Sequence, residues 1–404
     1  MTNARRDPRH RASAGFTLIE LLVVMGILTG FLLMLAQIVD GGLRLFGEGE
    51  LGQALADRAA SAQRRVAAEL ALLRGAAGAQ EGGPAADRLV VQDLPLGLPQ
   101  RPERGISRAQ VLRGAVRLPP ERELPLLDAK LAAELLRDDP KLDGDALTTR
   151  IAAARQGVPL RGLGNLLLLP WRQEGGDEAL LELRAAWLLP GQLVPVGPDR
   201  FVDPFDVALP GSPDLPGLAA WTLTQPLLAD LLHVEFQLWS QSTRTWARAD
   251  GTGGDAALRC WDSARGGWLI DAAMGGVFPL DRGAASAADP RDDVQPHAIL
   301  CRIVVAQPES FAPEGRLLAD LDADDTLLRL YDGDRFPGGA DGGWIKIRTE
   351  WIAYAERTGD ELRGLRRGQR GTAARDHTAG ARVHVGRTVE FVVPVLHAKD
   401  DWNG

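Results

Sequence analysis

The sequence predicts an α+β protein in which a long N-terminal helix, one half membrane-spanning and one half amphipathic, precedes a β-rich globular head. Two observations predict the helix: residues 16–39 are predominantly apolar, and the residues after them repeat apolar side chains at helical spacing. A third predicts the head: 46 glycines and 26 prolines among 404 residues divide the remaining chain into short segments. Frequent Gly and Pro favour strands and turns over long helices.

Length and charge limit the functions to consider. The chain exceeds one typical domain of roughly 100–200 residues, so an anchor with one large or two smaller folded units is expected. Its formal net charge is -8. Phosphate binding needs clustered Lys and Arg, so we expect no nucleic-acid partner for this acidic chain.

Residues 16–40 are predicted to form a membrane-spanning helix. At about 1.5 Å rise per residue, the apolar segment is long enough to cross a hydrocarbon core of roughly 30 Å. Four arginines precede it: Arg5, Arg6, Arg9 and Arg11. Basic flanking residues resist translocation, so the N-terminus is expected in the cytoplasm and the rest of the chain across the membrane.

Two features set this segment apart from an ordinary signal peptide or anchor. The small residues Ala14 and Gly15 precede the apolar segment, whereas a signal peptide carries its small-residue cleavage site after it. A plain anchor would have no reason to place Glu20 inside the apolar segment, because a carboxylate in hydrocarbon costs on the order of a few kcal/mol. The position of Glu20 therefore predicts a partner for its charge.

Gly15 followed by Phe16-Thr17-Leu18-Ile19-Glu20 resembles the prepilin signature of type IV pilins and type II secretion pseudopilins. The resemblance implies that residues 1–15 are a leader, that prepilin peptidase cuts after Gly15, and that Phe16 becomes the N-methylated first residue. It also implies that Glu20 pairs with the terminal amine of a neighbouring subunit, which satisfies two buried opposite charges together. We therefore expect a single-pass protein of the bacterial inner membrane that packs among other pilins or pseudopilins.

Residues 41–74 are predicted to continue the helix in amphipathic form. Apolar side chains recur at three- and four-residue steps: Leu51, Leu55, Ala59, Ala62, Val66, Leu70 and Leu73. An independent coiled coil is the alternative, but the segment holds only about three heptads. Glycines between residues 41 and 52 are expected to loosen or kink the helix, and the Gly-rich segment 75–86 is expected to end it.

Residues 75–310 are predicted to form the β-rich head, with an insertion near 101–162. Residues 231–239 alternate polar and apolar side chains, which predicts a strand with one buried and one solvated face. Tryptophan-bearing segments follow, and then a proline-led strand at 296–305. This order resembles J-type minor pseudopilins of type II secretion and W-type minor pilins. The resemblance implies I- and K-type minor pseudopilins as partners.

Residues 311–404 are predicted to form a small C-terminal β module. Its strands are short, and Gly or Asp stands at each joint. The strands 344–347 and 350–354 and the turn 367–377 resemble a small β module found in phage tail and surface proteins. That likeness concerns shape more than activity.

Three groups of residues could carry chemistry. An acid, a proton donor and a base could be formed by Glu350, Tyr354, Arg367 and His377, although a structural polar cluster is the interpretation we favour. Oxygen ligands at alternate positions could bind Ca²⁺ at Asp320, Asp322 and Asp324, with Asp325 beside them, although a solvated turn between strands is the interpretation we favour. We otherwise expect no cofactor. Cys260 and Cys301 could form a disulfide in an exported chain, or stay two buried thiols.

These features predict a structural subunit rather than an enzyme. The primary hypothesis is a minor pseudopilin-like protein that assembles at the tip of a type II secretion pseudopilus, because a bulky head would crowd a helical shaft. One alternative is a minor pilin of a type IV pilus, serving adhesion, DNA uptake or assembly priming. Another is a membrane-anchored extracytoplasmic hydrolase. The head is expected in the periplasm or extracytoplasmic space in each case.

Overall fold

The computed structural model of the chain describes most of the helix, the sheets and the module. The described residues are 18–74, 89–95, 108–171, 176–189, 194–195, 201–202, 225–240, 245–247, 259–263, 267–270, 296–307, 315–333, 336–338, 342–370 and 372–395. The chain divides into two compact units, Met1–Ala54 and Leu55–Gly404, and each is described by itself.

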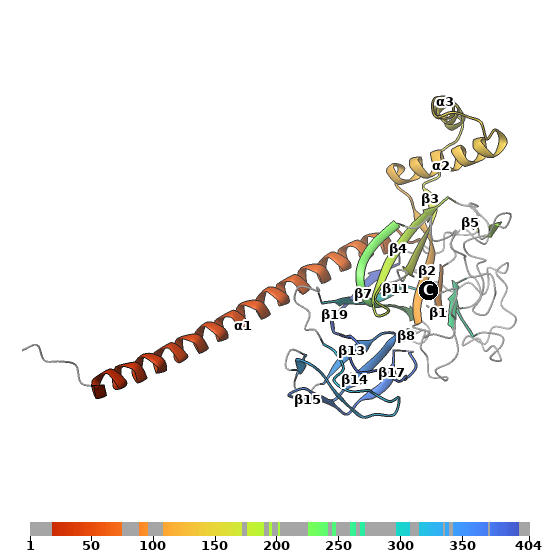
Figure 1. Cartoon of the computed structure of the whole chain (residues 1–404). Coiled ribbons are helices and arrows are strands. Elements are labelled where there is room, and N and C mark those ends of the chain that lie inside the picture. The colour runs from red at the N-terminus through yellow and green to blue at the C-terminus, as the bar shows by residue number, and fades with distance from the viewer. Residues whose placement is uncertain are drawn as a thin grey trace, which may run out of the picture. The chain divides into compact units, whose positions relative to one another are not determined.

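One helix, α1, begins at Leu18 and ends at Leu70 (Figure 1). It confirms the predicted long N-terminal helix. The glycines between residues 41 and 52 do not end it. A glycine inside a helix costs about 1 kcal/mol relative to alanine, but it keeps its N–H group, so the backbone hydrogen-bond pattern can continue through it.

The head is built on one antiparallel sheet of ten strands (Figure 1). The main path of the sheet runs β10-β9-β1-β2-β3-β4-β7-β11-β19, and β8 pairs with β7. The strands are β1 (Leu89–Pro95), β2 (Arg108–Arg117), β3 (Leu163–Trp171), β4 (Leu181–Leu188), β7 (Gln225–Ser240), β8 (Thr245–Ala247), β9 (Arg259–Asp262), β10 (Gly267–Ile270), β11 (Ala298–Ala306) and β19 (Gly386–Pro394). A separate pair of short strands is formed by β5 (Val194–Pro195) and β6 (Phe201–Val202).

The main core lies between this sheet and the C-terminal part of α1. From Ala59 onward the predicted apolar stripe of the helix is buried, and Val66 and Leu70 are both 0% exposed, whereas Leu55 is half-buried. Val66 and Leu70 pack in one cluster with sheet residues such as Leu168 and Phe236. The stripe therefore joins the helix to the head through apolar contact, the dominant favourable contribution to folding.

A helical hairpin connects β2 to β3. It consists of α2 (Pro120–Asp138) and α3 (Gly144–Arg155), and none of the residues of α3 is buried. The Asp143 side chain caps α3 by accepting a hydrogen bond from the Ala146 N–H at 2.8 Å. Of the predicted insertion near 101–162, residues 120–155 are this hairpin, whereas residues 108–117 form a strand of the head sheet.

The module consists of two small sheets, ordered β12-β16-β15 and β17-β14-β13-β18. Its strands are β12 (Leu327–Arg329), β13 (Gly343–Ile347), β14 (Glu350–Tyr354), β15 (Glu356–Thr358), β16 (Glu361–Arg363), β17 (Arg366–Gln369) and β18 (Val383–His384). It has a core of its own, to which Leu317, Ile345 and Ile352 belong. After β18 the chain returns to the head, because β19 pairs with β11 from Gly386 opposite Ala306 to Pro394 opposite Ala298. In chain order, the module is thus inserted between β11 and β19, which are paired neighbours in the head sheet.

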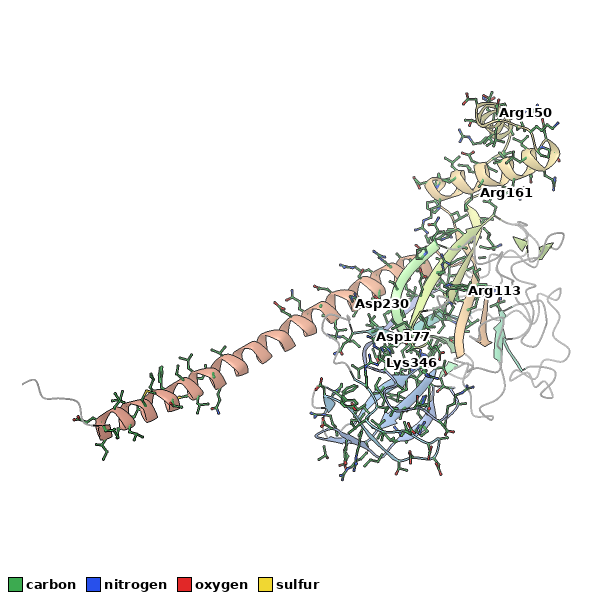
Figure 2. The ribbon with its side chains drawn as sticks, viewed as in Figure 1. Arg113, Arg150, Arg161, Asp177, Asp230 and Lys346 are labelled. Atoms are coloured by element: carbon green, nitrogen blue, oxygen red, sulfur yellow. The ribbon has the colours of Figure 1, made fainter. Side chains whose placement is uncertain are left out.

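A buried lysine marks the junction between module and head (Figure 2). Lys346 is 0% exposed, and its Nζ donates hydrogen bonds to Ala179 O at 2.8 Å and Leu232 O at 2.6 Å. Trp351 of β14 packs beside Ala179 and Leu232 of the head. Nearby, His384 of the module pairs with Asp177 at 2.9 Å.

This junction changes the expected surface of β7. The sequence predicts a solvated polar face for residues 231–239, but His233 and Gln237 are buried. Trp351 contacts the His233 ring edge to face, with the ring centroids 5.9 Å apart. Val234, Phe236 and Leu238 pack in the head core as predicted, but the opposite face is not solvated as expected, because the module covers part of it.

Candidate processing and assembly site

The first part of α1 can span a membrane by its length and composition. The span covers Leu18–Val39, and its large apolar side chains are exposed, as at Leu18 (79%) and Ile27 (69%). Exposed apolar surface of this extent marks contact with lipid or with other helices. The helix is therefore consistent with a single-pass membrane anchor.

Glu20 lies in the first turn of α1 and is the one charged residue between Leu18 and Val39. A carboxylate in the first turn interacts favourably with the positive end of the helix dipole. The same carboxylate would lie in hydrocarbon, where its charge is costly unless another group compensates it. Gly15 and Phe16, the predicted cleavage and methylation positions, lie outside the described residues.

Residues 10–36 match the family model described as the prokaryotic N-terminal methylation motif. The match includes Gly15, Phe16 and Glu20 and overlaps the start of α1. The chain thus combines a prepilin-type N-terminus, a helix consistent with a single-pass membrane anchor, and a β-rich head. More particularly, the motif supports a pilin- or pseudopilin-type protein, and it implies processing by prepilin peptidase and association with other pilins. No curated protein and no solved structure matches the chain.

Glu350, Arg367 and His377 are brought together in the module. Arg367 donates to both oxygens of Glu350, Nε to Oε1 at 2.8 Å and Nη2 to Oε2 at 2.9 Å. His377 Nε2 lies 2.8 Å from Oε2, and the N–H groups of Gly368 and Arg375 also donate to the carboxylate. Glu350 is 0% exposed. Burial would raise its pKa, but the hydrogen bonds from His377 and Arg367 outweigh burial and hold the pKa below its ordinary value.

Tyr354, the fourth candidate, does not join this cluster. Its hydroxyl donates to Pro337 O at 2.6 Å, and burial raises its pKa to about 12. Arg367 also donates to two backbone carbonyls, those of Asp322 and Arg375. The geometry therefore agrees with the structural polar cluster, in which Glu350 and Arg367 tie the long turn 367–377 to β14.

In the acidic turn, two carboxylates accept hydrogen bonds from backbone N–H groups. Asp320 Oδ1 accepts the Ala379 N–H at 2.7 Å, and Asp325 Oδ2 accepts the Asp322 N–H at 2.7 Å. Within the described part of the chain, no group of three or more His, Cys, Asp or Glu side chains could hold a metal ion. The turn that contains Asp320, Asp322 and Asp324 thus shows no coordinating cluster.

The Cys260–Cys301 disulfide is not formed. Cys301 is a free, buried thiol on β11, and burial raises its pKa well above the ordinary value. Cys260 belongs to β9, and five strands lie between β9 and β11 in the sheet order. A disulfide needs its two Cα atoms within about 7 Å, a separation that the strand order does not provide.

The sequence analysis did not single out the junction residues Lys346, Trp351 and Asp177. A strand reading Trp344-Ile345-Lys346-Ile347 predicts that the two isoleucines face a core and that Lys346 faces solvent. Ile345 and Ile347 do face the module core, but the other face meets the head. Trp351, opposite Lys346 on β14, was the one signal that this second face is covered.

Proposed function

We propose that this protein is a non-enzymatic minor pseudopilin-like subunit of a type II secretion pseudopilus. Prepilin peptidase removes residues 1–15, Phe16 is N-methylated, and the exposed apolar part of α1 packs among the helices of other subunits. The observation that carries the proposal is the position of Glu20, the one charged residue of the span Leu18–Val39, in the first turn of a helix that overlaps the methylation motif. Its charge pairs with the amino terminus of a neighbouring subunit.

Two further observations support a position at the filament tip. The head and module together form a unit that extends from Leu55 to Gly404, which is bulky for a subunit repeated along a shaft. The strand with Val234-Glu235-Phe236 and the proline-led strand, which resemble those of J-type minor pseudopilins, are antiparallel neighbours as β7 and β11. By that resemblance, I- and K-type minor pseudopilins are the partners.

Replacing Glu20 tests the proposal. Glu20→Ala should reduce incorporation into filaments by roughly tenfold or more, because the amino terminus of the neighbour loses its buried partner. Glu20→Asp keeps the charge and should retain part of the incorporation. Thr29→Ala, which removes another polar side chain from the same apolar segment, should leave it unchanged. The measurement compares the amount of the protein in the sheared filament fraction with the amount in the membrane fraction.

Mass spectrometry of the extracted protein gives the second readout. A mature chain that begins with N-methyl-phenylalanine at Phe16 is expected, and crosslinked neighbours then name the filament. A chain that still begins at Met1, or a Glu20→Ala variant with undiminished incorporation, would overturn the proposal. If the crosslinked neighbours are proteins of a retractable type IV pilus, the protein is assigned to that pilus and not to a pseudopilus.

A further inference from the structure

The module covers part of one face of β7 and buries His233 there. His233 is 7% exposed, and Trp351 of β14 contacts its ring edge to face. Beside it, Lys346 of β13 donates a hydrogen bond to Leu232 O at 2.6 Å. Head and module each have a hydrophobic core of their own, and His233 belongs to neither. The burial of His233 therefore depends on the contact between the two parts.

A carboxylate lies close to His233, but its oxygens already accept other hydrogen bonds. Nε2 of His233 lies 3.5 Å from Oε2 of Glu235. Arg302 donates to the same oxygen at 2.8 Å, and Gln237 Nε2 donates to Oε1 at 2.8 Å. Arg302 also pairs with Glu390 of β19. Glu235 is thus one member of a larger network and is not a dedicated counter-ion for the imidazole.

Positive charge reaches His233 from the module. Lys346 and Arg370 both disfavour a proton on the ring. The guanidinium of Arg370 lies between two tryptophan rings, 4.3 and 4.7 Å from their centroids. With Arg302, three cations face the two carboxylates of this network, so one positive charge is in excess. A protonated His233 would add another.

Burial and the positive neighbours keep His233 neutral while the module is docked. Burial is the larger cause; together with Arg370 and Lys346 it outweighs the attraction of Glu235 and lowers the pKa of His233 from 6.5 to about 4. When the module moves away, the ring faces water and its pKa returns to the ordinary value. The docked state is therefore fully stable above pH 6.5 and loses stability as the pH falls from 6.5 to about 4.

We propose that the junction is an acid-sensitive switch, which holds the module on the head near neutral pH and releases it in acid while both cores stay folded. The released module remains covalently joined to β11 and β19. Release exposes Trp351, which is 1% exposed when docked, and the polar face of β7. The switch is a property of this chain alone and does not depend on the filament it joins.

Thiol labelling of the full-length protein in detergent tests the proposal. Ala179→Cys introduces a reporter at a fully buried position beside Trp351, and the buried thiol of Cys301 reports on the head core of the same molecule. Mass spectrometry of peptides reads each thiol separately, Cys260 included. Each labelling rate is divided by the rate of the urea-unfolded chain at the same pH. Between about pH 7.5 and about pH 5, labelling of the introduced thiol should rise at least about tenfold, with Cys301 still protected.

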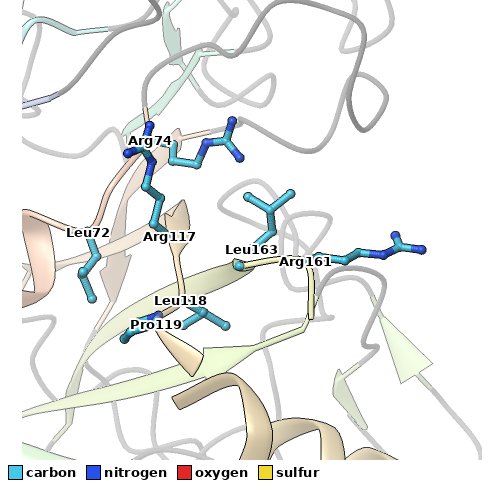
Figure 3. A pocket seen from close by; sticks show the side chains of 8 residues that line it. Leu72, Arg74, Arg117, Leu118, Pro119, Arg161 and Leu163 are labelled. Carbon is cyan, nitrogen blue, oxygen red and sulfur yellow. The ribbon is translucent and has the colours of Figure 1, made fainter. Parts of the chain in front are cut away.

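His233→Gln identifies the titrating group, because glutamine is polar but takes up no proton. In this background, labelling of the introduced thiol should change by less than about twofold between the two pH values. Arg161→Gln is the control for a lost charge, since Arg161 lines an open pocket (Figure 3) that shares no residue with the junction. Figure 2 shows Arg161 well apart from Asp177 and Lys346. The control should keep the full acid response.

His384→Gln separates the two histidines of the junction. His384 Nε2 lies 2.9 Å from Asp177, a contact that a proton on His384 strengthens, so this variant should keep the acid response. Equal labelling of the natural junction at both pH values, or a rise shared by Cys301, would overturn the proposal. So would a response that survives in His233→Gln or disappears in His384→Gln.

A measurement on the natural chain needs no substitution. Hydrogen–deuterium exchange at the imidazole carbon of His233, followed by mass spectrometry across a range of pH, gives the pKa of this residue. A pKa below 6.5 is expected for a ring that the module buries. A pKa of 6.5 or higher would overturn the proposal even if a variant fails to fold.

Discussion

Buried charged residues in the module are held by several hydrogen bonds at once. Glu350 accepts hydrogen bonds from Arg367, the backbone N–H groups of Gly368 and Arg375, and pairs with His377, all within 3.1 Å. Such a carboxylate has little accepting capacity left for a substrate or a metal. Its arrangement therefore favours a structural role, in which one residue ties together the turn that follows β17.

Glu350→Gln should lower the free energy of unfolding by about 3–5 kcal/mol, because it leaves the Arg367 charge buried without its partner. The pKa of Glu350 is depressed in the folded chain, so its contribution is present above the ordinary value of 4.5 and is lost as pH falls through the folded-state pKa. The difference between the natural chain and the variant should thus shrink in acid. Urea unfolding in detergent at several pH values measures it.

Glu121→Gln is the control for this prediction, because Glu121 is exposed on the first turn of α2. It should change the free energy of unfolding by no more than about 0.5 kcal/mol. A Glu350→Gln variant as stable as the natural chain, or a difference that grows in acid, would contradict the structural role of Glu350.

At the scale of elements, α1 has two parts with different environments. From Leu18 to Val39 its large apolar side chains are exposed, a surface suited to contact with lipid or other helices. From Ala59 to Leu70 the apolar stripe is buried in the head core. Glu69, beside this stripe, binds Arg122 of α2 and Trp187 of β4, so the end of the helix is joined to two other elements.

Leu70→Ala should destabilise the head by about 2–5 kcal/mol, because it leaves a cavity where a fully buried side chain packs against the sheet. Gln63→Ala changes an exposed position of the same helix and should have little effect. Thermal unfolding followed by circular dichroism compares the two variants. Equal melting temperatures for Leu70→Ala and Gln63→Ala would show that burial of the apolar stripe does not stabilise the head.

At the scale of the whole molecule, the connection of the module to the head is the main consequence of the topology. The chain enters the module from β11 and leaves it into β19, and these strands pair with each other. Lys346 and Trp351 fill the junction from the module side. Two covalent connections and a buried junction predict that head and module unfold together.

Hydrogen exchange measured by mass spectrometry tests this prediction. In the natural chain, the amides of β11 and β13 should exchange with similar free energies of opening. Lys346→Met should leave the carbonyls of Ala179 and Leu232 without this donor, at a cost of about 1–3 kcal/mol for each buried group, and β13 should then open more readily. Lys141→Met, at an exposed position, is the control. Independent exchange of β11 and β13 in the natural chain would contradict the prediction.

Local patterns predicted much of this architecture. The apolar segment and the three- and four-residue spacing after it predicted α1, and Val66 and Leu70 are buried as that spacing requires. Residues 231–239 and 296–305 were expected as strands and form most of β7 and β11. These predictions succeed because the side-chain period of a helix or strand is a local property of the chain.

By itself, the sequence determined the prepilin-type N-terminus, a helix long and apolar enough to span a membrane, and the β-rich class of the head, since each depends on residues that are close together in the chain. Only the tertiary structure decided that Cys301 is a free thiol, that β19 returns to pair with β11, and that Lys346 is buried against the head. Those outcomes depend on which distant strands become neighbours. Strand pairing is set by packing of the whole core, which no short segment of the sequence records.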